Sequence, residues 1–148
     1  MSAHRNFAFM LAAAILVTGA GVAFLWVLRA GGERSARIEL GRRLYVAHCA
    51  SCHGADLQGE PDWQSPKPSG HMPAPPHDAS GHTWHHSDEE LFRITKFGMS
   101  SVVPNYKSDM PAFGNVLSDQ EINAILAFIK STWPKRERDY RRERSRDR

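Results

Sequence analysis

The first third of the chain contains one unbroken apolar stretch, which sets it apart from the amphipathic patterns that follow. Residues 7–28 carry no charged side chain over 22 positions. At about 1.5 Å per residue, a helix of that length spans about 33 Å, which is enough to cross a bilayer, so the pattern predicts a transmembrane anchor. The alternative is a cleavable signal peptide, because Gly21-Val22-Ala23 is a small-x-small cleavage pattern. The apolar run continues to Leu28 and favours an anchor that is kept.

Beyond this stretch, apolar residues recur at spacings of three and four in three segments and predict three amphipathic helices. The first covers 37–47, the second runs from Ser87 to Gly98, and the third runs from Ser118 to Pro134. Each of the last two begins with a serine followed three residues later by a glutamate, which is a capping box. Their apolar faces comprise Ile38, Gly41, Leu44, Tyr45 and His48, then Leu91, Ile94 and Thr95, then Ile122, Ile125, Leu126 and Ile129. No segment has a convincing strand pattern, so the predicted fold class is all-α.

The segment between the first two helices, residues 54–86, is a long loop. It holds six of the nine prolines in 33 residues and has few apolar side chains. A loop of this length would ordinarily argue against a compact domain. A further source of apolar surface is needed to explain it.

Charge is distributed unevenly along the chain, although the formal net charge is only +3. Residues 135–148 carry eight basic and four acidic side chains, whereas residues 33–134 carry nine basic and twelve acidic ones. A basic tail without interleaved apolar residues is usually solvated and disordered, and we expect that here. Docking to anionic lipid headgroups or to an acidic partner is the functional alternative.

The candidate chemistry lies in the five residues Cys49-Ala50-Ser51-Cys52-His53, which form a C-x-x-C-H motif for covalent haem attachment. The two thiols can add to the two vinyl groups of the porphyrin, and His53 is placed to bind the iron. A thioredoxin-like pair and half of a zinc site are the alternatives. They fit less well, because the chain has no other cysteine and no βαβ pattern. One haem would also supply the apolar surface that the loop 54–86 needs.

Haem attachment also decides the orientation of the anchor. Arg5 precedes the apolar stretch while Arg29, Arg34 and Arg37 follow it, so the positive-inside rule alone points the haem domain inward. In bacteria, however, the thioethers form outside the cytoplasmic membrane, so we expect a single-pass protein with its haem domain in the periplasm. The expected parts are a cytoplasmic N-terminus (1–6), the anchor (7–28), a linker (29–36), the haem domain (37–134) and the tail (135–148).

The chain resembles the class I c-type cytochromes over residues 37–133. The segment from Gly41 to Cys49 is similar to the family's N-terminal helix, and Leu126-Ala127-Phe128-Ile129-Lys130 resembles its C-terminal helix. The resemblance implies three main helices with long loops around one haem c. It also implies that Gly41 packs against Phe128 where the two helices cross. Thr83-Trp84 is similar to a family segment whose tryptophan reaches a haem propionate, with core packing as the alternative role of Trp84.

The resemblance further implies Met110 as the sixth iron ligand, because this methionine lies in the loop where the family has its thioether donor. Met72 and Met99 are the rival methionines. The run 73–76 (Pro-Ala-Pro-Pro) is expected to supply a carbonyl that orients His53. A His/Met pair raises the reduction potential and leaves no open coordination position. These properties fit an electron carrier and not an enzyme.

Histidines are crowded around the long loop, at His71, His77, His82, His85 and His86. Together with Met72 they are potential copper or zinc ligands. Their irregular spacing matches no standard site, so solvated histidines or a pH-sensitive docking surface are the alternatives.

The expected function is therefore a membrane-tethered monohaem c-type cytochrome that carries single electrons between respiratory complexes. The expected partners are the lipid bilayer, a cytochrome bc-type complex and a terminal oxidase or reductase, and not nucleic acid. Two alternatives are a fixed electron-transfer subunit of a larger redox enzyme, and a haem or metal sensor or copper-handling protein that uses the histidine-rich loop.

Overall fold

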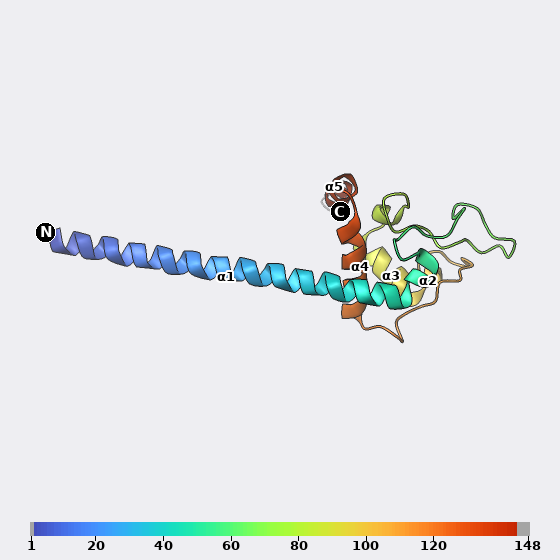
Figure 1. Cartoon of the computed structure of the whole chain (residues 1–148), viewed down its shortest axis with the longest axis horizontal. Helices are drawn as coiled ribbons and strands as arrows, with labels where there is room; N and C mark the ends of the chain where they lie inside the picture. Colours follow the sequence, from blue (N-terminus) through green and yellow to red (C-terminus); the bar gives the residue numbers. More distant parts are fainter. Residues whose placement is uncertain (1, 145–148) are drawn as a thin grey trace. The chain divides into compact units, whose positions relative to one another are not determined.

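A computed structural model describes the backbone of residues 2–144 and the side chains of residues 21–143. Within the described backbone every regular element is helical, as Figure 1 shows, and this confirms the all-α prediction. The elements are α1 (Ser2–His48), α2 (Ala50–His53), the 3₁₀ turn η1 (Thr83–His85), α3 (Asp88–Phe97), the 3₁₀ turn η2 (Met99–Ser101), α4 (Asp119–Thr132) and α5 (Lys135–Arg144).

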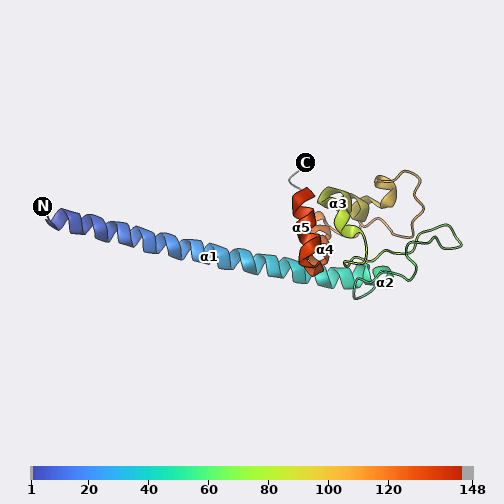
Figure 2. The ribbon, with the colours of Figure 1, turned by 90° about the horizontal axis from the view of Figure 1, so that it is seen from above.

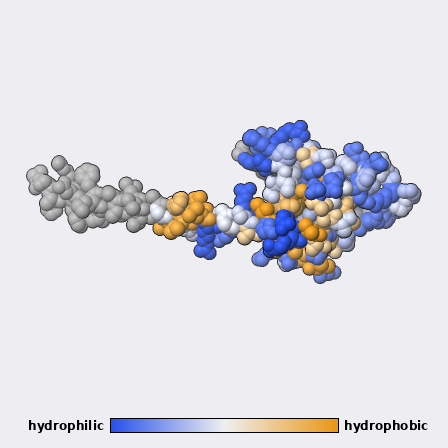
Figure 3. Space-filling view, viewed as in Figure 1, coloured by the Kyte–Doolittle hydropathy of each residue, from blue (hydrophilic) through white to orange (hydrophobic). Residues whose placement is uncertain are grey.

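The chain divides into two compact units, residues 1–36 and residues 37–148. In the first unit, the described part of α1 exposes a run of large apolar side chains at Val22 and at 24–28, visible as the orange atoms beside the grey segment in Figure 3. Among the residues described, no helix is both long and apolar enough to cross a membrane. The side chains of residues 7–20 lie outside the described part, so the anchor over 7–28 stays a prediction.

The second unit is organised by the crossing of two helices, the end of α1 and α4 (Figures 1 and 2). The backbones approach so closely that a Cβ atom on Gly41 would lie 1.9 Å from the carbonyl oxygen of Ala124. The closest approach to Gly41 is therefore at Ala124, and the packing of Gly41 against Phe128 itself stays a prediction. Phe128 lies one turn further along the same face of α4 and packs against Tyr45, with 5.5 Å between ring centroids.

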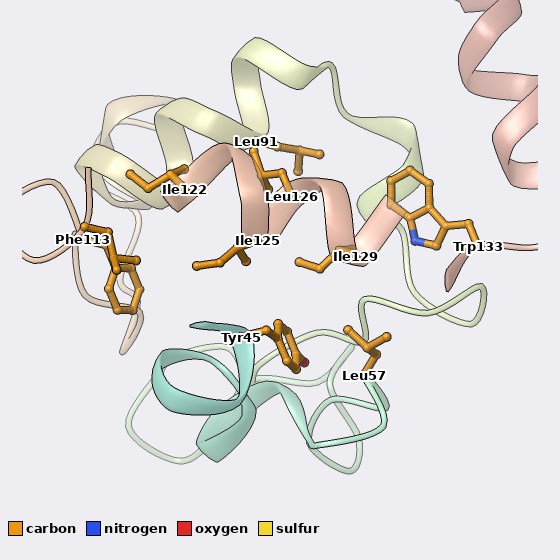
Figure 4. Close-up of a cluster of buried hydrophobic side chains, with 10 residues drawn as sticks. Tyr45, Leu57, Leu91, Phe113, Ile122, Ile125, Leu126, Ile129 and Trp133 are labelled. Atoms are coloured by element: carbon orange, nitrogen blue, oxygen red, sulfur yellow. The ribbon is translucent and has the colours of Figure 1, made fainter. Parts of the chain in front are cut away.

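The hydrophobic core lies between these helices and the segments that cover them. Figure 4 shows Tyr45 of α1 and Leu57 of the long loop facing Ile125 and Ile129 of α4. The buried cluster consists of Tyr45, Leu57, Leu91, Phe113, Leu117, Ile122, Ile125, Leu126, Ile129 and Trp133. The apolar positions predicted for the third amphipathic helix all belong to this cluster, as the 3.6-residue periodicity requires.

Serine caps begin α3 and α4 at the predicted positions. Ser118 accepts a hydrogen bond from the backbone N–H of Glu121, and the carboxylate of Glu121 accepts one from the backbone of Ser118, so this capping box is complete. Ser87 accepts from the backbone N–H of Glu90, but the Glu90 carboxylate lies 3.1 Å from His86 Nδ1 instead. Such caps stabilise a helix by about 1 kcal/mol each.

The C-terminal segment departs from its prediction, because residues 135–144 form helix α5 where a disordered tail was expected. Arg141 lies over the Trp133 ring, 5.3 Å from its centroid, and pairs with Asp88. Tyr140 meets Trp84 edge to face at 5.2 Å. These long-range contacts order a segment whose composition alone favours solvation. Residues 145–148 of the predicted tail lie outside the described part.

The helix crossing yields a prediction about stability. Replacing Gly41 with alanine should destabilise the haem domain by about 3 kcal/mol, because the added Cβ meets rigid backbone and no rotamer can relieve the overlap. Gly32→Ala is the matched control, since Gly32 lies in the same helix and nothing is within 4 Å of its added Cβ. Thermal unfolding should show a midpoint lowered on the order of 10 °C for Gly41→Ala alone. Equal midpoints for the two variants would contradict the close crossing.

Candidate haem site

The two cysteines lie at the junction of α1 and α2. The backbone N–H of Cys49 donates to Tyr45 at 2.8 Å, and Cys49 is also the N-cap of the short helix α2. Cys52 follows three residues later, so both sulfur atoms lie on one side of this turn. Gly54 then ends the helix at φ +79°, where its carbonyl accepts a hydrogen bond from the hydroxyl of Tyr45 at 2.9 Å.

His53 is buried at the end of α2 and is held by the long loop. Its Nδ1 lies 2.8 Å from the carbonyl oxygen of Pro75. Because a carbonyl only accepts, Nδ1 must carry the proton, which leaves the lone pair on Nε2 free to bind a metal. The prediction that the proline-rich run supplies this carbonyl is confirmed, and the structure identifies Pro75 as the residue.

Burial shifts the pKa values of both His53 and Cys49. It lowers the pKa of His53, and the Pro75 carbonyl opposes the shift only in part, so the imidazole is neutral at neutral pH. Burial and the neighbouring Cys52 raise the pKa of Cys49 to about 11. Two soft sulfur atoms beside one neutral, oriented imidazole fit a covalently attached haem. They do not make a structural zinc site, which takes four ligands, because the described residues contain no group of even three His, Cys, Asp or Glu side chains that could hold a metal ion.

Among the three candidate methionines, Met110 is the one that packs against the hydrophobic core, as Cys49 also does. Its backbone N–H donates to Ser108 Oγ at 3.1 Å. The loop is also joined to α3, since the backbone N–H of Phe113 donates to the carbonyl of Thr95 at 3.0 Å. The fold therefore directs the Met110 loop toward the domain interior.

A polar network on the surface links this loop to the long loop. The Asp109 carboxylate contacts His71 Nδ1 at 2.5 Å and Lys67 Nζ at 3.5 Å, and Lys67 also pairs with Glu60 at 3.1 Å. The second Glu60 oxygen accepts from the backbone N–H of Ala74, next to Pro75, at 2.6 Å. The hydrogen bond from His71 lowers the pKa of Asp109, and that from Ala74 lowers the pKa of Glu60. Sequence analysis missed this network, which joins residues up to 49 positions apart.

The histidine-rich region is not assembled as a metal site. Within the described part of the chain, no group of three or more His, Cys, Asp or Glu side chains could hold a metal ion. The rings have other neighbours instead. His82 stacks on Trp63 at 5.3 Å between centroids, His85 lies against Trp84 at 3.7 Å, and His71 contacts Asp109.

Trp84 is held by its own loop in this structure. Its indole N–H donates to the carbonyl of Gly81 at 3.0 Å, and its ring contacts His85 and Tyr140. The propionate contact remains a prediction.

Comparison with known proteins agrees with the geometry of this site. The profile of the cytochrome c family matches residues 38–133, about two-thirds of the chain. The chain is also 29% identical to cytochrome c6 from Tetradesmus obliquus over 99 residues, covering 64% of this chain and 90% of that protein. No solved structure matches. The chain therefore belongs to the cytochrome c family, whose members carry electrons on one covalently attached haem c.

Proposed function

We propose that this protein is a membrane-tethered monohaem electron carrier on the periplasmic side of a bacterial cytoplasmic membrane. The observation that carries the electron-carrier part of the proposal is the hydrogen bond between His53 Nδ1 and Pro75, which leaves Nε2 available to bind a metal beside two cysteines. A neutral, oriented imidazole in this position suits a permanent axial ligand. The membrane part rests on the uncharged sequence of residues 7–28.

The site residues have distinct roles in this proposal. Cys49 and Cys52 form the thioethers, and His53 and Met110 are the two axial ligands. The bound haem supplies a one-electron iron couple. Backbone and side-chain groups would hold the two ligands in place. The Pro75 carbonyl orients His53, and the Met110 loop is fixed by backbone hydrogen bonds and by the ion pairs of Asp109. His53 and Met110 would together leave no open coordination position on a bound haem, which would suit electron exchange without substrate binding.

The anchor over residues 7–28 would keep the haem domain beside the membrane. The linker of residues 29–36 is part of α1, and eight helical residues span only about 12 Å. A short tether raises the effective concentration of membrane-bound partners without strong docking contacts. We propose a cytochrome bc-type complex as donor and a terminal oxidase or reductase as acceptor.

A redox titration of the purified protein tests the carrier role. We expect a reduced-minus-oxidised spectrum with one haem c, a high midpoint potential and no carbon monoxide binding, because both axial positions are filled. Rapid carbon monoxide binding to the reduced protein would instead indicate a sensor or an enzyme with an open position.

The tether can be tested separately from the haem chemistry. A variant with a cleavable signal in place of residues 1–30 should keep the parent spectrum and potential but support slower electron transfer in membranes. Adding excess soluble protein should restore the rate, because the tether acts through concentration. The tether is refuted if the natural chain is recovered in the soluble periplasmic fraction with Phe24 as its first residue.

A further inference from the structure

His77 lies flat against His53, the proposed axial ligand. Their ring centroids are 4.0 Å apart and their planes differ by only 21°. His77 is two residues beyond Pro75, so the same segment contacts the His53 ring in two ways. The Pro75 carbonyl restrains one atom of the His53 ring, Nδ1. A single hydrogen bond to one ring atom still allows the plane to tilt, whereas a planar neighbour across the ring face opposes that tilt.

The His77 ring is itself firmly held. The hydroxyl of Thr83 donates its one hydrogen to the Pro76 carbonyl at 3.3 Å, so in its 2.8 Å contact with His77 the hydroxyl oxygen accepts a hydrogen bond from the Nδ1–H of the ring. The backbone of His77 is fixed on both sides, because its N–H donates to Leu57 at 2.8 Å and its carbonyl accepts from the indole of Trp133 at 2.8 Å. The stacked ring therefore has little freedom to move away from His53.

A third ring, Tyr45, also contacts His77. Tyr45 meets His77 edge to face, with 6.3 Å between centroids and 70° between planes. Tyr45 is fully buried and is anchored by its hydroxyl on the Gly54 carbonyl. The His77 ring thus contacts both a fixed tyrosine and the imidazole of His53.

We propose that His77 is a positioning residue that fixes the plane of the His53 imidazole about the metal–nitrogen axis. The proposal rests on the assignment of His53 as an iron ligand in the proposed function. Groups that do not touch a metal commonly set the orientation of its ligands, and the Pro75 carbonyl is one such group here. The stack adds a second restraint from the same loop. It also assigns a role to one member of the histidine-rich region that needs no second metal.

The orientation of an axial imidazole can be read directly by proton NMR. In a ferric low-spin haem, the orientations of both axial ligands set how unpaired spin is shared among the four haem methyl groups, so a change in the imidazole plane alters their shifts when the second ligand is left unchanged. We expect His77→Ala to change the order or compress the spread of the four methyl shifts, because the His53 plane is no longer held. His77→Phe should keep the parent order, because a planar ring still faces His53.

A second pair of variants acts through the anchor of the His77 ring. Thr83→Val removes the hydroxyl that His77 contacts and should shift the methyl pattern in the direction of His77→Ala. Thr83→Ser restores a hydroxyl and should return the parent pattern. This pair decides the matter even if His77→Ala fails to bind haem. Parent-like shifts in His77→Ala would overturn the proposal, as would a His77→Phe pattern equal to that of His77→Ala. If His77→Ala fails to bind haem, parent-like shifts in Thr83→Val would overturn it.

The ligand assignment is checked in the same samples. His53→Ala should abolish the low-spin ferric spectrum of the parent. If that spectrum survives, the axial assignment in the proposed function fails. If it is lost and the His77 variants leave the methyl shifts unchanged, only the positioning role of His77 fails.

Discussion

Replacing both Cys49 and Cys52 with alanine is expected to abolish the cooperative fold of residues 37–134. The large apolar side chains between positions 54 and 86 are only Leu57, Trp63, Met72 and Trp84, so this loop has little to pack against without a porphyrin. Each Å² of buried apolar surface stabilises a fold by about 25 cal/mol, and a small domain buries little apolar surface. Loss of the porphyrin surface should therefore be severe. Without thioethers, haem is no longer retained covalently. The double variant should therefore lack a sharp thermal transition.

Circular dichroism during heating measures this outcome. Ser51→Ala is the matched control, because it changes the same motif while keeping both sulfurs, and it should retain the haem and a sharp transition. A haem-free double variant that still melts cooperatively would show that the side-chain core alone supports the fold. The cluster around Tyr45 and Ile125 would then be sufficient without the cofactor.

Local signals in the sequence predicted the helices well, because helix starts and apolar faces depend on residues three or four positions apart. Ser118 and Glu121 form the expected capping box, and the predicted apolar face is buried as its spacing requires, at Ile122, Ile125, Leu126 and Ile129. Local spacing could not predict which residue of α4 lies closest to Gly41. Ala124 and Phe128 share one face of α4 a single turn apart, and only the observed crossing selects Ala124.

Features that depend on distant contacts escaped prediction. Helix α5 reads as a solvated tail by composition, yet Arg141 and Tyr140 meet aromatic rings and an acid from earlier in the chain. His77 looked like one of several loop histidines. Its contact with His53 arises because Pro75 brings that loop to the imidazole, which no sequence spacing encodes.

The haem motif was readable because its five residues are contiguous and its chemistry constrains their order. The second axial ligand has no such local signature, since a methionine followed by proline occurs at both 72 and 110. Met110 packs against the core and Met72 does not. This difference is consistent with Met110 as the sixth ligand, which the family resemblance implied.

Replacing Met110 with alanine is expected to lower the midpoint potential on the order of 0.2 V, since axial ligands set haem potentials over a span of about 0.8 V. A thioether favours ferrous iron, so its loss stabilises the ferric form. The sixth position also opens, and the reduced variant should bind carbon monoxide. The loop itself should remain in place, because the bonds from Phe113 to Thr95 and from His71 to Asp109 do not use the methionine side chain.

Met72→Ala and Met99→Ala are the matched controls, because each also removes one thioether side chain, and neither of these methionines packs against the core. Both should keep the parent potential and exclude carbon monoxide. The near-infrared band from sulfur to ferric iron gives the sharpest reading, because it requires a bound thioether. We expect the band to disappear in Met110→Ala alone. If the band instead persists in Met110→Ala and is lost in Met72→Ala, the sixth ligand is Met72 of the long loop. Both axial ligands would then lie in or beside that loop.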